Sequence, residues 1–148
     1  MNRTIVLVAG CLMMAASVAA EETTGAAASS LGSTKEQRAV AAAERWLALV
    51  DAGHYGQAWD EAASYFKGAV TKDQWTGSLN GVRAPLGRVI SRQEQSARLS
   101  TELPGAPDGE YVVIEFQTNF ANKSSGIETV TPVRETDGSW KVTGYYIR

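Results

Sequence analysis

Cysteine and histidine are almost missing from this sequence of 148 residues, each occurring once, as Cys11 and His54. A disulfide framework needs paired cysteines, and a zinc site of Cys and His needs several ligands, so both are excluded. A Cys-His catalytic dyad within one mature chain is excluded as well. The sequence also lacks a glycine-rich phosphate loop and the aspartate spacing of a calcium loop. We therefore expect no metal and no cofactor.

An excess of positive charge is also lacking. Fourteen Lys and Arg stand against sixteen Asp and Glu, which gives a net charge of -2 and a pI near 5.4. Binding to a nucleic-acid backbone depends on such an excess, so a nucleic-acid partner is not expected. With 44% hydrophobic residues and only 4 Pro, the chain has the composition of a single folded domain.

The first 20 residues resemble a secretory signal peptide. Arg3 precedes an apolar run over residues 5–18, and small residues end the segment at Ala20, before Glu21. The run is too short for a transmembrane helix, which needs about 20 apolar residues. The sequence thus predicts cleavage after Ala20, a periplasmic or secreted protein, and no membrane span in the mature chain.

A second interpretation of this segment concerns Cys11. The residues Val8-Ala9-Gly10-Cys11 resemble a bacterial lipobox, which would make Cys11 the lipidated first residue of an anchored protein. That cleavage leaves only some seven apolar residues before it, at the lower end of the usual range of about 7–15. After a signal peptide at 1–20, residues 21–32 have neither periodicity nor bulk, which is typical of a flexible leader. The folded domain is predicted to span residues 33–148.

Helical periodicity fills the first half of this domain. A capping box of Ser33 and Glu36 predicts the start of a first helix, and Gly53 its end. Apolar spacing predicts a second helix from Tyr55 past Phe66 to about Gly68. A third helix is predicted from a cap at Thr71 to the residues before Pro85.

Alternation with period two replaces the helical pattern after Gly87. Strands are predicted over residues 89–103, 111–120, 127–135 and 140–147, with a bulge or edge at Pro132. In the first strand, the alternation places Arg92 on one face of the strand and Ala97 and Leu99 on the other. The fold class is therefore α+β: three N-terminal helices packed on one face of a curved four-stranded antiparallel sheet.

The candidate functional residues are few. Glu115 lies within the second strand and is a candidate general base if its face lines a pocket, but the alternation with Ile114 and Phe116 favours a solvated position. His54 lies in a predicted interhelix turn without a nucleophile or an orienting partner nearby. Trp46, Trp59 and Trp75 fall on the apolar sides of the helices, which favours core packing over ligand stacking.

Basic residues gather between positions 83 and 98. This stretch has a net charge of +3 and contains one acid, Glu94. Such a cluster could bind an acidic partner or an anionic envelope component, and the other interpretation is a solvated face. The candidate binding residues are Arg83, Arg88, Arg92 and Arg98.

Tyr111 is a further candidate for partner binding. The alternation places it with Val113 and Val130 on the sheet face away from the core. Apolar side chains there suggest that this face is covered. A homodimer through the outer sheet face is one explanation, and a monomer with scattered apolar residues or a covering leader is the other.

The order of these segments resembles a known family. The helix, Gly-x-Tyr helix, capped third helix, curled sheet and closing strand are similar to the cystatin-like or nuclear transport factor 2-like superfamily. More narrowly, the chain from about residue 36 to 148 resembles a bacterial exported family known as domain of unknown function 4019. The similar segments include Ala43-Glu44-Arg45-Trp46-Leu47, Asp51-x-Gly53-x-Tyr55, Pro104-Gly105-Ala106-Pro107-Asp108-Gly109-Glu110-Tyr111, Glu128-Thr129-Val130 and Trp140-Lys141-Val142-x-Gly144-Tyr145.

This resemblance implies an exported protein and a fold, and no activity, because the scaffold supports isomerases, hydrolases and binding modules alike. From the residues we expect a non-catalytic binding or interaction module, whose partner is a protein or an envelope component. The alternative is a small-molecule enzyme or carrier that uses the pocket between sheet and helices.

Overall fold

The computed structural model describes residues 33–148, which form a compact unit of their own. The predicted signal peptide, the lipobox at Cys11 and the leader at 21–32 lie outside the described residues. The elements in chain order are α2 (Lys35–Asp51), α3 (Tyr55–Asp60), α4 (Ser64–Ala69), α5 (Lys72–Val82), the short 3-10 helix η1 (Ala84–Leu86), β1 (Val89–Ser100), β2 (Tyr111–Phe120), β3 (Lys123–Arg134) and β4 (Trp140–Ile147). Helices precede strands, so the class is α+β.

The sheet is an antiparallel meander. Its strands lie in the order β1-β2-β3-β4, each paired with its neighbour in sequence. This arrangement was predicted, and so was the irregularity at Pro132, where the β3–β4 register shifts between Thr131 and Pro132. The strand β3 begins at Lys123, four residues earlier than predicted, because Phe120 pairs with Lys123 across a tight hairpin.

The helical half differs from the prediction in number. The predicted second helix is two helices, α3 and α4, because Ala63 leaves the helical conformation and donates its backbone N–H to the carbonyl of Val142 in β4 (2.8 Å). A tertiary hydrogen bond thus replaces the helical one. The first helix is capped by Thr34 and Gln37 rather than Ser33 and Glu36. Thr71 and Gln74 form the predicted box on α5, and Gly53 has the expected positive φ of 78°.

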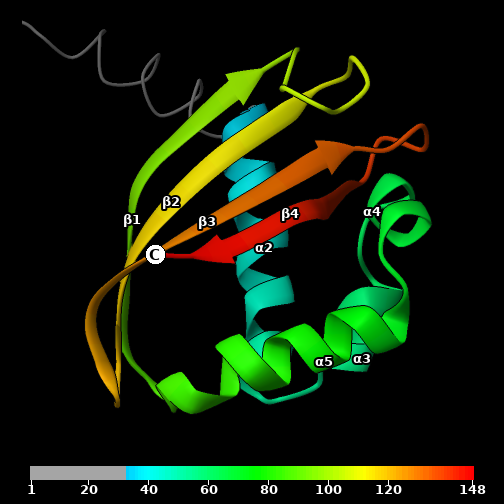
Figure 1. Cartoon of the computed structure of the whole chain (residues 1–148). Coiled ribbons are helices and arrows are strands. Elements are labelled where there is room, and N and C mark those ends of the chain that lie inside the picture. Colours follow the sequence, from blue (N-terminus) through cyan, green and yellow to red (C-terminus); the bar gives the residue numbers. More distant parts are fainter. Residues whose placement is uncertain (1–32) are drawn as a thin grey trace, which may run out of the picture. The chain divides into compact units, whose positions relative to one another are not determined.

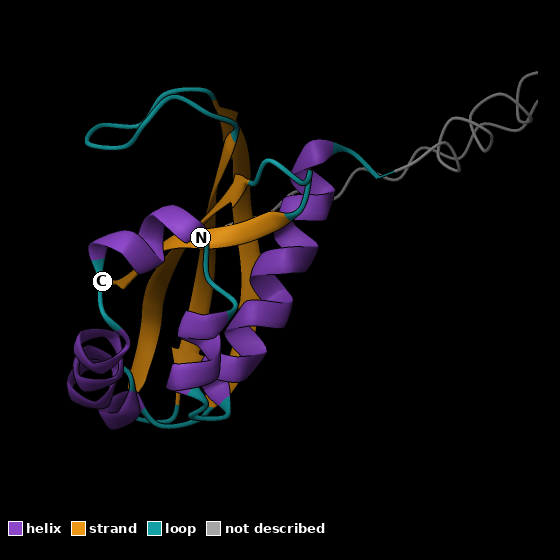
Figure 2. Cartoon of the chain, turned by 90° about the vertical axis from the view of Figure 1, so that its right-hand side faces the viewer, coloured by secondary structure: helices purple, strands orange, loops and turns teal. Residues whose placement is uncertain are grey.

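The core joins helices and sheet. The long helix α2 contacts all four strands, and α3 lies beside α5 (Figures 1 and 2). Trp46, Leu47 and Val50 of α2 belong to one buried cluster with Ile114 and Phe116 of β2. Burial of these large apolar side chains is the main source of stability for such a unit.

Aromatic rings fill the space near the last strand. Trp75 lies between Trp46 (ring centroids 5.7 Å apart) and Phe66 (5.2 Å), and Tyr145 of β4 lies 5.3 Å from Trp46. Most of these rings meet edge to face, the arrangement that aromatic pairs prefer. The indoles of Trp46, Trp59 and Trp75 are hydrogen-bonded to the backbone carbonyls of Ala58, Val70 and Tyr55. These three tryptophans therefore hold the helices together.

Candidate functional site

A fully buried carboxylate, Glu128, lies in the middle of β3. Its Oε1 accepts hydrogen bonds from Thr118 Oγ1 of β2 (2.6 Å) and from Arg92 Nε of β1 (2.8 Å). Its Oε2 accepts one from the Tyr145 hydroxyl of β4 (2.5 Å). Side chains from all four strands therefore meet at one acid, and both of its oxygens are held by donors of the protein.

The hydrogen bonds continue from Arg92 to the helices. Arg92 donates to both carboxylate oxygens of Asp51 at the end of α2, at 2.7 and 3.0 Å. Asp51 also accepts from Arg83, which follows α5 (3.1 Å). Arg83 donates in addition to the carbonyl of Gly87 (2.6 Å) and lies 4.7 Å from the ring centroid of Phe120. We call the set Asp51, Arg83, Arg92, Thr118, Glu128 and Tyr145 the buried polar network.

The charges of the network stabilise each other. Burial disfavours the charged form of Arg92, but its hydrogen bonds to Asp51 and Glu128 outweigh burial and raise its pKa. Burial, together with the negative charge of Glu128, raises the pKa of the Tyr145 hydroxyl. Arg92 thus stays a cation and Tyr145 a neutral donor over the physiological pH range. A general base must reach its substrate, and Glu128 is fully buried, with three of the about four acceptor positions of its carboxylate filled by Arg92, Thr118 and Tyr145.

A β-bulge explains why Arg92 is inside. The β1–β2 register shifts between Glu94 and Ser96, so Arg92, paired with Thr118, lies on the same face as Ala97, paired with Ile114. The prediction that Arg92 lies opposite Ala97 and Leu99 was therefore wrong. A bulge adds one residue to the strand, so faces assigned by strict alternation are exchanged beyond it.

The four arginines do not form one cluster. Arg83 is buried and Arg92 nearly so, and both belong to the buried polar network. Arg88 and Arg98 are exposed, and neither forms an ion pair within residues 33–148. The stretch 83–98 therefore divides into two internal and two solvent-facing cations.

Glu115 lies away from the buried polar network. Its neighbours Ile114 and Phe116 point into the core, while the Glu115 side chain is 32% exposed and accepts from Arg148 (3.0 Å). Its Cα partners are Ser96 and Thr129. Glu115 therefore pairs with Arg148 on the sheet face opposite the buried polar network. His54 precedes α3 at an exposed position, and its side chain makes no capping hydrogen bond.

Tyr111 is covered by its own chain. It is buried, its hydroxyl donates to the carbonyl of Pro107 (2.5 Å), and Gly109 lies close against its ring. The β1–β2 loop therefore covers it. Val130 was predicted on the outer face, but it is fully buried in the core cluster opposite Ile114. Of Tyr111, Val113 and Val130, which suggested a covered outer face, Tyr111 is thus covered by a loop of its own chain and Val130 lies in the core.

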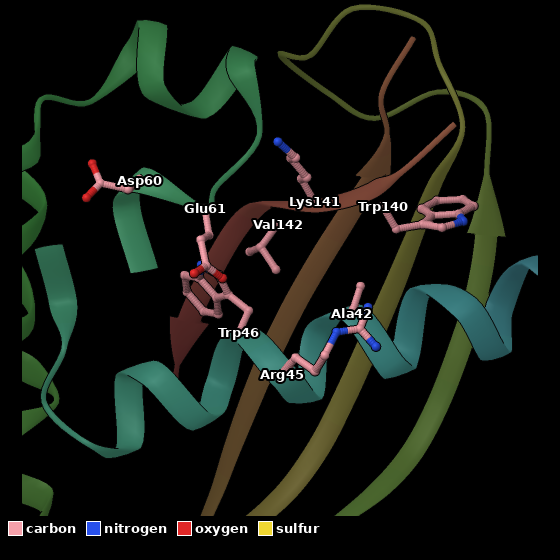
Figure 3. A pocket seen from close by; sticks show the side chains of 8 residues that line it. All are labelled: Ala42, Arg45, Trp46, Asp60, Glu61, Trp140, Lys141 and Val142. Atoms are coloured by element: carbon pink, nitrogen blue, oxygen red, sulfur yellow. The ribbon is translucent and has the colours of Figure 1, made fainter. Parts of the chain in front are cut away.

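A surface pocket of about 280 Å³ lies where α2, the end of α3 and β4 meet (Figure 3). Its apolar lining consists of Ala42, Trp46 and Val142, and Trp140 is half-buried beside them. Its charged lining residues are Arg45, Asp60, Glu61 and Lys141. We call it the α2–β4 pocket. It combines apolar and aromatic side chains with charged groups of both signs.

Several groups at this pocket are free to bind. Within residues 33–148, Arg45, Glu61 and Lys141 form no ion pair, whereas Asp60 is paired with Lys72 (2.7 Å). The indole N–H of Trp140 has no hydrogen-bond acceptor in this part of the chain either, unlike those of the other three tryptophans. The sequence analysis missed this pocket, because Arg45, Glu61 and Trp140 are far apart in the chain and carry no motif.

Two further observations on the described residues concern metal ions and membranes. Residues 33–148 contain no group of three or more His, Cys, Asp or Glu side chains arranged to hold a metal ion. In the same range, no helix has the length and apolar character needed to cross a membrane.

Comparison with known proteins places the chain in a family. No curated protein matches it. One family model, described as a protein of unknown function (DUF4019), matches residues 42–145. This range contains every member of the buried polar network, from Asp51 to Tyr145, and every residue lining the α2–β4 pocket, from Ala42 to Val142. The chain therefore belongs to the DUF4019 family.

Proposed function

We propose that this protein is a non-catalytic binding module whose ligand occupies the α2–β4 pocket. The observation that carries the proposal is a contrast between two sites. At the buried polar network, the fully buried Glu128 carboxylate already accepts hydrogen bonds from Arg92, Thr118 and Tyr145. At the pocket, Arg45, Glu61 and the Trp140 indole have no strong partner among the described residues. Groups that a ligand could satisfy therefore lie at the surface.

Ligand-observed NMR with a library of small polar fragments tests this proposal. We expect saturation transfer to some fragments with the wild-type protein, its loss with Trp140→Ala, and unchanged fragment spectra after prolonged incubation. Leu99→Ala is the matched control, because Leu99 is exposed and lies outside the pocket. Chemical conversion of a fragment, or binding that survives Trp140→Ala, contradicts the proposal.

The second candidate function is an enzyme or carrier that uses the interior between sheet and helices. One observation favours it: Arg83 is buried, yet its Nε has no acceptor among the described residues. A buried donor without a partner attracts an acceptor, either water or a ligand. This function requires the ligand to reach Arg83, so Arg83→Lys would abolish fragment binding while Trp140→Ala would not.

We infer in addition that the fold is the cystatin-like or nuclear transport factor 2-like cone, with the helices on one face of a curved sheet. The contacts of α2 with all four strands of the meander support this inference. So does the hydrogen bond from Ala63, just before α4, to Val142 of β4. A crystal structure with a helix on the Glu115 face of the sheet would contradict it.

We infer export to the periplasm or the medium from the sequence of residues 1–20 alone. In that compartment, the binding partner of the protein is an envelope component, a protein or a small molecule. Mass spectrometry of the exported protein tests the inference: a chain beginning at Glu21 supports it, a diacylated Cys11 indicates a lipoprotein, and retention of Met1 contradicts export.

We propose a homodimer through the outer sheet face on the residues that its own chain leaves uncovered, since Tyr111 and Val130 are covered within the chain. Val113 remains half-buried there, and Tyr146 is 56% exposed. Light scattering at high micromolar concentration tests the dimer. A molar mass twice that of the monomer, which Tyr146→Glu reduces to the mass of the monomer, supports it. A monomeric mass for the wild-type protein contradicts it.

A further inference from the structure

The chemistry of the α2–β4 pocket limits what it can hold, and this inference rests on the proposed binding function. The pocket volume is about 280 Å³. Pockets for drug-sized ligands span about 300–1,000 Å³, so this pocket lies at the small end of that range and suits a small molecule. The floor of Trp46 and Val142 is apolar and almost fully buried. One part of the ligand is therefore apolar.

Two hydrogen-bond donors, Arg45 and Trp140, line the pocket. Figure 3 shows Arg45 of α2 and Trp140 of β4 on the same side of the view, with Ala42 between them. Among residues 33–148, neither the Arg45 guanidinium nor the Trp140 indole N–H has an acceptor. The planar guanidinium of Arg45 favours an anionic group with two oxygens, such as a carboxylate.

An acceptor lies on the other side of the pocket. Glu61 follows α3 and is drawn next to the Trp46 ring in Figure 3, away from Trp140. Its carboxylate accepts only a long hydrogen bond from Gln57 (3.2 Å) and forms no ion pair within the described part of the chain. The neighbouring Asp60 is already neutralised by Lys72. Glu61 thus offers the available negative charge, which favours an ammonium group.

Arg45 and Glu61 carry opposite charges at one pocket but do not pair with each other. A ligand that bridges them needs an anion for Arg45 and a cation for Glu61. It also needs an apolar part to displace water from the aromatic floor. We propose that the α2–β4 pocket binds a small amphipathic zwitterion of the α-amino-acid class, with its carboxylate at Arg45, its ammonium at Glu61 and its side chain over Trp46.

Three related probes test the assignment of each charge by calorimetry on the full chain. L-leucine carries both charges, L-leucinamide lacks the carboxylate, and N-acetyl-L-leucine lacks the ammonium. We expect L-leucine to bind most tightly and each analogue to bind about tenfold more weakly, because each loses one charged hydrogen-bonding group.

Two substitutions complete the test, both at exposed residues. Arg45→Gln should weaken L-leucine and N-acetyl-L-leucine but not L-leucinamide. Glu61→Gln should weaken L-leucine and L-leucinamide but not N-acetyl-L-leucine. Arg38→Gln on α2 and Glu102→Gln are matched controls, since both residues are exposed and outside the pocket, and they should change nothing.

Either of two results overturns the assignment. One is the absence of L-leucine binding at millimolar concentration, and the other is a pattern in which the substitutions weaken all three probes equally. The fragment library tests the binding function independently. Fragments that bind at Trp140 while L-leucine does not would reject the amino-acid class and leave the proposed function standing.

Discussion

The hydroxyl of Tyr145 donates to Glu128 at 2.5 Å and so closes a chain of hydrogen bonds that runs through Arg92 and Asp51 to Arg83. This chain links β4, the last strand, to the end of α2, the first described helix. Replacing one partner of a buried pair leaves the other charge uncompensated, which is far more costly than losing the pair as a whole.

Arg92→Leu should strongly destabilise the protein. The substitution leaves Glu128, which is fully buried, without its cation. Loss of one partner of a buried ion pair costs about 3–5 kcal/mol in the free energy of unfolding. Urea denaturation, monitored by tryptophan fluorescence, measures this change in the free energy of unfolding. Arg98→Leu serves as the control, and because Arg98 is exposed we expect a change within about 0.5 kcal/mol. Equal effects of the two substitutions would show that Arg92 is not part of a buried network.

Tyr145→Phe should lower stability and change its dependence on alkaline pH. At neutral pH, loss of the hydroxyl leaves Oε2 of Glu128 without a donor, at a cost of about 1–3 kcal/mol. Burial and Glu128 raise the pKa of Tyr145 above the value of 10.0 expected in the unfolded chain. Above that pH, the unfolded state has released a proton that the folded state retains, so wild-type stability falls as pH rises.

The Tyr145→Phe variant has no hydroxyl to ionise at this position. Its free energy of unfolding should therefore fall less than that of wild type between neutral pH and pH values above 10. Thermal unfolding across that range measures the difference. Tyr111→Phe provides a comparison, because burial raises the pKa of Tyr111 too, but its hydroxyl contacts the Pro107 carbonyl rather than a carboxylate. If wild type and Tyr145→Phe have parallel profiles, the Tyr145–Glu128 contact does not govern the alkaline limb.

Glu110→Gln should flatten the acid limb of the stability profile. Lys35, and then Arg134, lower the pKa of Glu110 below its usual 4.5. A carboxyl whose pKa is lowered by folding adds stability above its unfolded pKa, and this contribution is lost as pH falls through the folded pKa. The melting temperature of the variant should thus fall less steeply below about pH 4.5 than that of wild type. Added salt should reduce the difference, since these charges are exposed. An unchanged acid limb would mean that the two cations do not act on Glu110.

Local patterns predicted the sheet better than they predicted the site. Alternation predicted the bounds of β2, because Val112, Ile114 and Phe116 recur with period two. The predicted bounds of β4 are also those of the structure. Arg92 was misplaced because the bulge before Ser96 depends on pairing with β2, which is not visible in the strand itself. The break between α3 and α4 likewise depends on a hydrogen bond from Ala63 to β4. Glu128 shares a face with Val130, which the alternation placed on the outer side of the sheet, so the sequence did not indicate that Glu128 is buried.

The four tryptophan indole N–H signals offer the most direct measurement of where ligand binds. Trp140 and Trp46 line the α2–β4 pocket, whereas Trp75 and Trp59 do not, and Trp75 packs beside Tyr145 in the interior. In proton–nitrogen correlation spectra recorded while a binding fragment is added, we expect the Trp140 signal to move most and that of Trp75 to stay in place. Movement of Trp75 with Trp140 unchanged would place the ligand in the interior and contradict this account.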